Sequence, residues 1–198
     1  MAIILRLSAI ALGLMVGLGG AHAQQNTNIR GTITAFEGSQ LTIRTGQGTS
    51  ITVNLPETVN VAITKPFSLA DIKPGMVLGV TTLPRADGRV VAIDVRPIPA
   101  TANQGLSPWD LQPQSTMTNA TFEGAAQAPD GNELTLNYKT GTVKVLVLPT
   151  TAMSQAAPGS RADLKPGERV FVAARADSSG ALTPIRVQVS KDGINPTQ

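Results

Sequence analysis

The chain lacks cysteine altogether, and its single histidine, His22, lies within the first 23 residues. Thiolate and imidazole are the usual protein ligands of zinc and other transition metals. Imidazole is also the general base of serine and cysteine hydrolases. Residues 24–198 therefore lack the groups for these chemistries, and no disulfide can stabilise their fold. Carboxylate chemistry, serine–lysine pairs and the binding of hard cations stay open.

Charged and aromatic side chains are also scarce, at 15% and 3% of the residues. After residue 23, fifteen Lys and Arg stand against thirteen Asp and Glu, and the basic residues are scattered. Nucleic-acid binding needs a basic patch, and single-strand binding adds aromatic platforms. We therefore expect no nucleic acid among the partners. Low charge together with abundant Gly, Thr, Val and Pro indicates an all-β protein with many turns.

Residues 1–23 have the pattern of a secretory signal peptide. Met1 and Arg6 supply a short positive n-region, the stretch Ile3–Leu18 is mostly apolar, and an A-x-A site ends at Ala23. Cleavage is predicted between Ala23 and Gln24. The alternative is an uncleaved anchor, but the apolar run is shorter than the roughly 20 residues that a membrane span needs. We expect a periplasmic or secreted protein with no membrane span in its mature chain.

Two segments of the chain match each other. Ala70–Gly75 reads ADIKPG, and Ala162–Gly167 reads ADLKPG, 92 residues further on. Flanking apolar positions match at the same or a similar spacing, and Phe36-Glu37-Gly38 matches Phe122-Glu123-Gly124 at a spacing of 86. Several matches in one order predict two homologous units.

Within each unit, apolar and polar residues alternate, as in residues 41–45, 134–139 and 185–189. Such alternation is typical of strands with one face on a core. Asp-Gly pairs between the runs supply the positive φ angles of tight hairpins. Closing five or six strands into a small barrel would bury both the apolar face and the sheet edges. A single larger sandwich is the alternative fold.

The predicted organisation follows from these boundaries. It consists of a signal peptide (1–23), a first β-barrel (27–98), a Pro-rich linker (99–116), a second β-barrel (117–191) and a C-terminal tail (192–198). We expect the two barrels to pack on each other or on the linker, because about 70 residues make a marginal core.

The linker contains the only tryptophan of the chain, Trp109, followed by Asp110. A disordered tether has no reason to carry this apolar surface. One interpretation is that Trp109 clamps the linker into a groove between the barrels. The other is that Trp109 and Asp110 are exposed and contact a partner, since tryptophan is a frequent hot spot. Burial of the large indole surface favours the clamp.

Candidate ligands and nucleophiles are few. Asp130, Asn132 and Glu133 lie in one loop and offer oxygens to calcium, but a Pro-Asp-Gly turn accounts for the loop without a ligand. Glu37 and Glu123 precede a glycine in both units and are interpreted as turn or strand-end residues. We predict no metal site and no cofactor from these residues.

Two serine–lysine pairs, Ser68 with Lys73 and Ser160 with Lys165, lie near the repeated hexapeptide. No neighbouring sequence marks either serine as an activated nucleophile. We therefore predict no catalytic residue and no enzymatic activity. A carboxylate-dependent hydrolase is a third, weaker hypothesis.

The repeated hexapeptide itself is predicted to be a turn before a core strand. Pro74 suits the first corner of a type II turn, and Gly75 tolerates the positive φ of the second. Asp71 is expected to cap the backbone amides ahead of it, and Ile72 and Leu164 are expected to enter the core.

The repeated unit resembles a bacterial family of small exported domains of unknown function. The matching residues of the first unit are Gly31, Ile33, Leu41, Val53, Ile72–Gly75, Gly88 and Ile93, and those of the second are Leu134, Val145, Leu164–Gly167, Gly180 and Ile185. The resemblance implies small OB-like barrels and supplies no catalytic residues. Some relatives carry the label "metal ABC transporter permease", from which this chain departs because a permease needs several membrane spans.

Together these features predict an exported, non-enzymatic binding or scaffolding protein of the bacterial cell envelope. Its ligand is unknown, and an envelope protein or a glycan is the expected partner. The alternative is an accessory protein for metal or solute uptake that binds a hard cation or a transport component.

Overall fold

The computed structural model describes residues 25–197, and these residues form an all-β protein. Two single-turn 3-10 helices, η1 (Leu69–Asp71) and η2 (Arg161–Asp163), interrupt the strands. No helix in this part of the chain is long and apolar enough to cross a bilayer. The strands are β1 (Gln25–Glu37), β2 (Gln40–Thr45), β3 (Ser50–Asn54), β4 (Val61–Pro66), β5 (Val77–Pro84), β6 (Val90–Pro97), β7 (Gly105–Pro108), β8 (Thr116–Ala128), β9 (Gly131–Asn137), β10 (Thr142–Val147), β11 (Ala152–Pro158), β12 (Arg169–Ala176) and β13 (Leu182–Val189).

Five strands form a closed barrel in the order β10-β9-β8-β5-β6, and a short parallel pairing of β10 with β6 closes it. Apolar residues that alternate along these strands fill the interior, including Leu78, Val80, Leu134, Leu136 and Val145, which are at most 1% exposed. Full closure leaves these strands without free edges and buries their apolar face.

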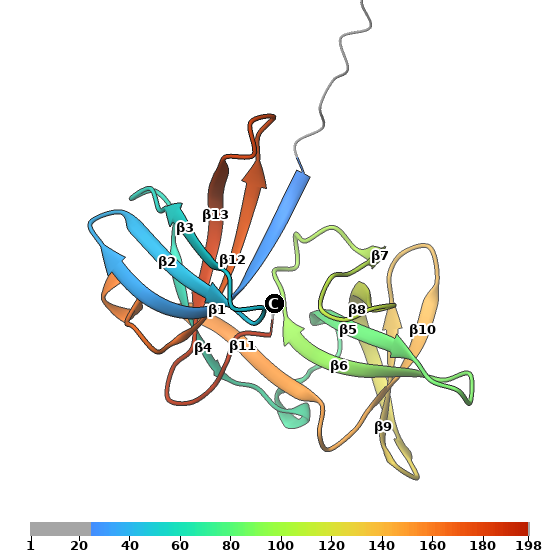
Figure 1. The fold of residues 1–198 in the computed structure, drawn as a ribbon. Coiled ribbons are helices and arrows are strands. Elements are labelled where there is room, and N and C mark those ends of the chain that lie inside the picture. The colour runs from blue at the N-terminus through green and yellow to red at the C-terminus, as the bar shows by residue number, and fades with distance from the viewer. Residues whose placement is uncertain (1–24, 198) are drawn as a thin grey trace, which may run out of the picture.

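The remaining long strands form a second group, the five-stranded sheet, in the order β3-β2-β1-β12-β13. Its apolar face carries a separate core that includes Ile33, Leu41, Ile43, Val172 and Val187. Figure 1 shows this sheet and the closed barrel as two distinct groups of strands, with β4 and β11 between them.

The strand pairing differs from the predicted division into residues 27–98 and 117–191. The closed barrel combines β5 and β6 from the first segment with β8, β9 and β10 from the second. The five-stranded sheet combines β1, β2 and β3 with β12 and β13. Each segment therefore contributes three strands to one core and two strands to the other.

The crossing occurs at β4 and β11, which pair with each other in antiparallel orientation. β4 also pairs with β13 of the sheet, and β11 pairs with β6 of the barrel. After β4, Phe67 enters the core of the barrel, and after β11, Leu164 enters the core of the sheet. The two segments thus exchange their C-terminal strands around this pair.

The repeated hexapeptide forms the turn that follows each crossing. Gly75 and Gly167 have φ angles of 86° and 94°, and the Met76 amide donates to the Lys73 carbonyl at 3.0 Å. This confirms the predicted type II turn. Ile72 packs against the barrel core and Leu164 is buried in the sheet core, as predicted.

The predicted role of Asp71 needs a correction. Its carboxylate accepts hydrogen bonds from the backbone amide and the hydroxyl of Ser68, which lies before it in the chain. Ser68 is the N-cap residue of the single turn η1, and its backbone amide is the free donor that needs an acceptor, so Asp71 caps an amide that precedes it in the chain. Asp163 caps Ser160 in the same way.

Ile185 was predicted on a core face but is 45% exposed. The register of β12 and β13 shifts here, so that Ala173 faces Arg186 and Ala174 faces Pro184. Ile185 is the extra residue of this β-bulge, and a bulge breaks the simple alternation of inward and outward side chains.

Candidate functional site

The predicted linker joins the closed barrel to the five-stranded sheet, because β7 pairs with β8 while Trp109 and Asp110 contact Arg30 of β1. Residues 105–108 form β7, and the segment from Trp109 to Ser115 forms a closed turn. The backbone amide of Trp109 donates to the Ser115 carbonyl at 2.8 Å, and the Ser115 hydroxyl donates to the Trp109 carbonyl at 2.9 Å. Because Ser115 is only 4% exposed, this turn is anchored in the protein. Trp109 itself is half-buried.

Asp110 attaches this turn to β1. Its two carboxylate oxygens accept hydrogen bonds from the Arg30 guanidinium at 2.8 and 3.0 Å, and one of them also accepts from the Asn28 side chain at 3.1 Å. Partial burial acts to raise the pKa of Asp110. The hydrogen bonds and charge of Arg30, with the Asn28 bond, outweigh it and hold that pKa below its usual value. Asp110 is therefore a charged tether between the linker and β1.

Aromatic rings and guanidinium groups alternate on this face. Arg30 lies over the Trp109 ring, 5.9 Å from its centroid, and over the Phe171 ring at 5.2 Å. Arg186 lies over Phe171 as well, at 5.0 Å. Phe171 is 1% exposed, so its ring is enclosed by these cations and the sheet. Cation–π contacts of this kind stabilise the relative placement of the linker and the strands.

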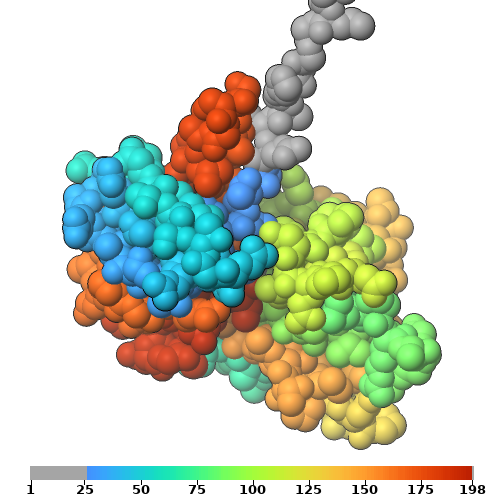
Figure 2. All heavy atoms as spheres, viewed as in Figure 1, coloured from blue at the N-terminus to red at the C-terminus, as the bar shows by residue number. Residues whose placement is uncertain are grey.

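A cleft of about 300 Å³ opens beside this stack. Apolar side chains dominate its lining, and two amides and a guanidinium supply polar groups at its walls. Such a composition is common in ligand-binding sites. The lining residues are Asn26, Asn28, Trp109, Phe171, Ala173, Ile185 and Arg186. The hairpin of β12 and β13, which carries part of this lining, stands out from the surface beside β1 in Figure 2.

A buried ion pair lies on β6. Asp94 is completely buried and accepts a hydrogen bond from Arg96, which is 9% exposed. Thr197, close to the C-terminus, donates to the other carboxylate oxygen. Loss of hydration raises the pKa of Asp94 and lowers that of Arg96 to about 10. The positive charges of Arg186 and Arg30 also contribute to the lowered pKa of Arg96.

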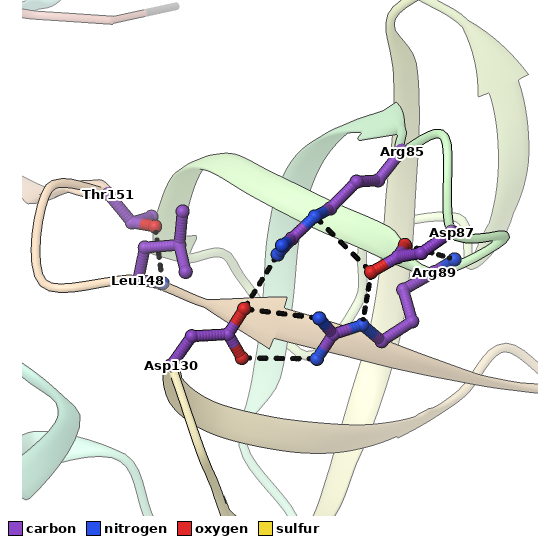
Figure 3. Close-up of polar contacts among 6 residues, drawn as sticks. All are labelled: Arg85, Asp87, Arg89, Asp130, Leu148 and Thr151. Atoms are coloured by element: carbon purple, nitrogen blue, oxygen red, sulfur yellow. Dashed lines mark hydrogen bonds and ion pairs between the residues drawn. The ribbon is translucent and has the colours of Figure 1, made fainter.

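The acidic loop considered for calcium is engaged in ion pairs. Asp130 accepts hydrogen bonds from Arg85 at 2.7 Å and from Arg89 at 3.0 and 3.1 Å. Figure 3 shows these side chains and Asp87 converging across two adjacent hairpin loops. Glu133 accepts a hydrogen bond from Lys144. Asp130 therefore joins two hairpins, and among residues 25–197 no three acidic, cysteine or histidine side chains form a metal cluster.

The two serine–lysine pairs do not form. The Ser68 hydroxyl donates to Asp71 at 2.6 Å, and the Ser160 hydroxyl donates to Asp163 at 3.1 Å. These serines serve the 3-10 caps described above. Lys73 and Lys165 belong to the turns that follow.

Glu37 and Glu123 occupy different places despite their matching sequence context. Glu37 pairs with Gln40 at the end of the β1–β2 hairpin. Glu123 lies in the β-bulge of β8 and accepts a hydrogen bond from Asn137. Neither glutamate belongs to the cleft, and Ala23 and Gln24, the predicted cleavage site, lie outside the described residues.

A comparison with known protein families gives a match to part of the chain. Residues 30–96 match the family described as Domain of unknown function (DUF5666). This stretch runs from β1 to β6 and therefore includes strands of both groups. Neither a curated protein nor a solved structure shows significant similarity to the chain.

Several residues of the stack beside Trp109 were missed by the sequence analysis. Arg30, Phe171 and Arg186 build the stack beside Trp109, yet they lie 79, 62 and 77 residues from it in the sequence. The only sequence signal for these residues is their position in an alternating strand. Each faces outward, and the residues next to it in the chain face the core. Of the predicted pair, Trp109 lines the cleft, and both Trp109 and Asp110 contact Arg30.

Proposed function

We propose that this protein is an exported, non-enzymatic binding protein of the bacterial cell envelope, and that its ligand contacts the cleft beside Trp109. One observation carries the proposal. The only tryptophan of the chain is held by Arg30 and Asp110 next to Phe171, at the wall of a largely apolar cleft. A half-buried indole with a few polar groups around it suits recognition better than it suits chemistry.

We further propose that the fold consists of two OB-like barrels derived from one duplicated unit, with their C-terminal strands exchanged. Both segments contain the same serine-to-aspartate cap and the same positive-φ glycine. They also share two β-bulges, one in β1 and β8 and the other in β6 and β13. The five-stranded sheet would then be the counterpart of the closed barrel. In it, β3 and β13 would take the places of β10 and β6, the two strands that close the barrel.

Export is supported by the first 23 residues, whose charge, apolar run and A-x-A site follow the secretory pattern. The DUF5666 match at residues 30–96 agrees with the resemblance to a family of domains of unknown function and does not bear on export. The proposed location is the periplasm or the cell exterior.

Site-specific photo-crosslinking in the producing cell tests the proposal. A photoreactive amino acid replaces Ile185, which lines the cleft and is 45% exposed. The matched control carries it at Gln127, an exposed position at the far end of β8. We expect a specific adduct at position 185 that disappears when Trp109→Ala is added. Equal adducts at both positions, or none at 185, would contradict the proposal.

A second measurement addresses the cation-binding alternative. If the protein binds a hard cation, millimolar calcium or manganese raises its Tm by several degrees through linkage. Our proposal predicts a Tm that does not depend on these ions, because Asp130 and Glu133 are paired with basic side chains.

A further inference from the structure

The first half of β8 has a backbone partner on each side. Residues Thr116 to Thr121 pair with β5, and on the opposite edge Thr116 to Asn119 pair with β7. β9 takes over that edge from Thr121 onward. The linker strand β7 thus fills the part of the edge that β9 does not reach.

The first half of β1 corresponds to this part of β8. Val77 and Arg169 both lie two residues after a turn glycine, and their partners are Thr121 of β8 and Thr32 of β1. Counting back from these partners, residues 27–30 of β1 correspond to residues 116–119 of β8. The edge that β7 occupies in the closed barrel therefore has a counterpart at residues 27–30 of the five-stranded sheet.

This counterpart edge is open within residues 25–197. β12 pairs with the whole first half of β1, but β2 begins to pair only at Gly31. The amide and carbonyl of Ile33 both face the β12 side, where they bond Glu168 and Gly167. Backbone groups alternate in direction along a strand, so those of Asn28 and Arg30 face the open edge.

We propose that an extended peptide segment of a partner protein binds here by adding a strand antiparallel to β1, as β7 does to β8. The inference rests on the proposed function, and it assigns the class of ligand and the mode of binding. Backbone hydrogen bonds to Asn28 and Arg30 would supply affinity, and side-chain pockets would supply specificity.

The surroundings of the edge define the chemistry of this peptide. Asn26 and Asn28 belong to the cleft lining, so side chains on one face of an added strand would lie next to this wall of the cleft. An apolar side chain fits that position. Arg175 lies opposite Asn26 on β12, on the far side of β1 from the open edge, and is exposed. Its long side chain extends on the same face as Asn26, so an acidic residue beside Asn26 in the peptide is favoured by charge.

The geometry favours a short peptide over a second copy of the chain. In the closed barrel the equivalent edge accepts four residues of β7, beyond which β9 continues the pairing. In the sheet, β2 continues the pairing from Gly31 in the same way. The open stretch is thus bounded by β2 at one end and is only a few residues long.

Hydrogen exchange of the protein, produced from its full-length reading frame with its own leader, provides the first test. Amides that face an open edge exchange quickly, whereas those in a ladder are protected. We expect fast exchange at Asn28 and Arg30 and slow exchange at Thr27 and Ile29, which face β12. Slow exchange at all four residues in the free protein would show that the edge is already covered and would overturn the proposal.

The second test uses a phage-displayed library of random heptapeptides selected on the same protein. We expect enriched sequences with an apolar and an acidic residue, whose synthetic forms protect the Asn28 and Arg30 amides. Methylation of the peptide amides that face β1 should abolish binding, whereas methylation of the alternate amides, on the opposite edge of the peptide, should leave binding intact. Absence of enrichment, or peptides that tolerate methylation on both edges, would overturn strand addition.

Variants separate this inference from the proposed function. Asn28→Pro removes the amide at the open edge and leaves the β12 ladder intact, and Asn28→Thr removes the same side chain but keeps the amide. We expect the Pro variant to bind the peptide at least tenfold more weakly than the Thr variant. Equal affinities of the Pro and Thr variants would overturn strand addition. A peptide affinity that Trp109→Ala leaves unchanged would overturn only the role of the cleft.

Other occupants of the edge give different results. A dimer in light scattering that Asn28→Pro dissociates would assign the edge to a second copy of the chain. Binding of peptidoglycan fragments with equal affinity to both Asn28 variants would assign the cleft to a glycan, which cannot continue a backbone ladder. Either result would overturn the peptide proposal.

Discussion

Thr64 of β4 lies directly opposite Ala156 of β11, at the centre of a symmetric antiparallel ladder. The two residues are 92 positions apart, the spacing that also separates ADIKPG from ADLKPG. The ladder keeps this symmetry on both sides, with Ala62 opposite Pro158 and Pro66 opposite Ser154. Residues 62–66 and 154–158 therefore pair symmetrically about this position, as the proposed duplication with exchanged strands requires.

Exchange predicts that the chain survives a cut in the linker. A protease site inserted after Pro113, an exposed residue of the turn, allows cleavage of the folded protein. Because each core contains strands from both segments, the two fragments should co-elute as one species in size-exclusion chromatography. They should separate only in denaturant. Fragments that separate under native conditions would indicate two independent barrels.

Local features of this fold could be predicted from the sequence, whereas the exchange could not. Alternating apolar residues indicated the strands around Leu41 and Leu134, and Pro74-Gly75 indicated the turn, because each depends on neighbouring residues alone. Under the proposed duplication, exchanged and unexchanged arrangements would bury the same alternating faces. The choice between them depends on the path of β4 and β11, which no local pattern encodes.

The turn glycines offer a test of backbone strain. An added Cβ at Gly75 or Gly167 meets no atom within 4 Å, but the φ angles of 86° and 94° disfavour any other residue. Gly75→Ala and Gly167→Ala should each lower the free energy of unfolding by about 1–3 kcal/mol. Gly46→Ala is the matched control, since Gly46 has equal space and no positive φ. Urea denaturation measures all three, and equal midpoints would show that the turns carry no strain.

The buried pair of Asp94 and Arg96 predicts a large effect from a single substitution. Asp94→Ala leaves the Arg96 charge buried without its partner, so we expect a loss of about 3–5 kcal/mol of stability. Asp94→Ala combined with Arg96→Met removes both charges and should recover most of that loss. Glu57→Ala, at an exposed carboxylate, is the control. A double variant as unstable as the single one would mean that the pair acts through packing rather than charge.

The candidate site was predicted only in its linker half. Trp109 and Asp110 stood out because a large aromatic residue in a Pro-rich segment is unusual. Arg30, Phe171 and Arg186 did not, because an outward-facing side chain on a strand normally faces water. They become part of a site only when the linker folds over β1, β12 and β13, a contact between residues far apart in the sequence.

The tether between Asp110 and Arg30 predicts a pH-dependent environment for Trp109. Asp110→Asn removes the charge that Arg30 pairs with, and the cost in stability should be below about 1 kcal/mol because the pair is largely exposed. The fluorescence of Trp109, the only tryptophan, should nevertheless shift to the red and become more open to iodide quenching. In the parent protein the emission should be blue-shifted and poorly quenched at pH 7.

The direction of the pH effect follows from the lowered pKa of Asp110 in the folded protein. The unfolded chain has an Asp pKa of about 3.9. The tether therefore stabilises the fold fully above that pH, and its contribution is lost as the pH falls through the lower, folded pKa. Iodide quenching of the parent protein should rise in this acidic range, and so should that of the control Glu57→Gln. Asp110→Asn should lack this step, and a step of equal size in the variant would show that another group holds Trp109 in place.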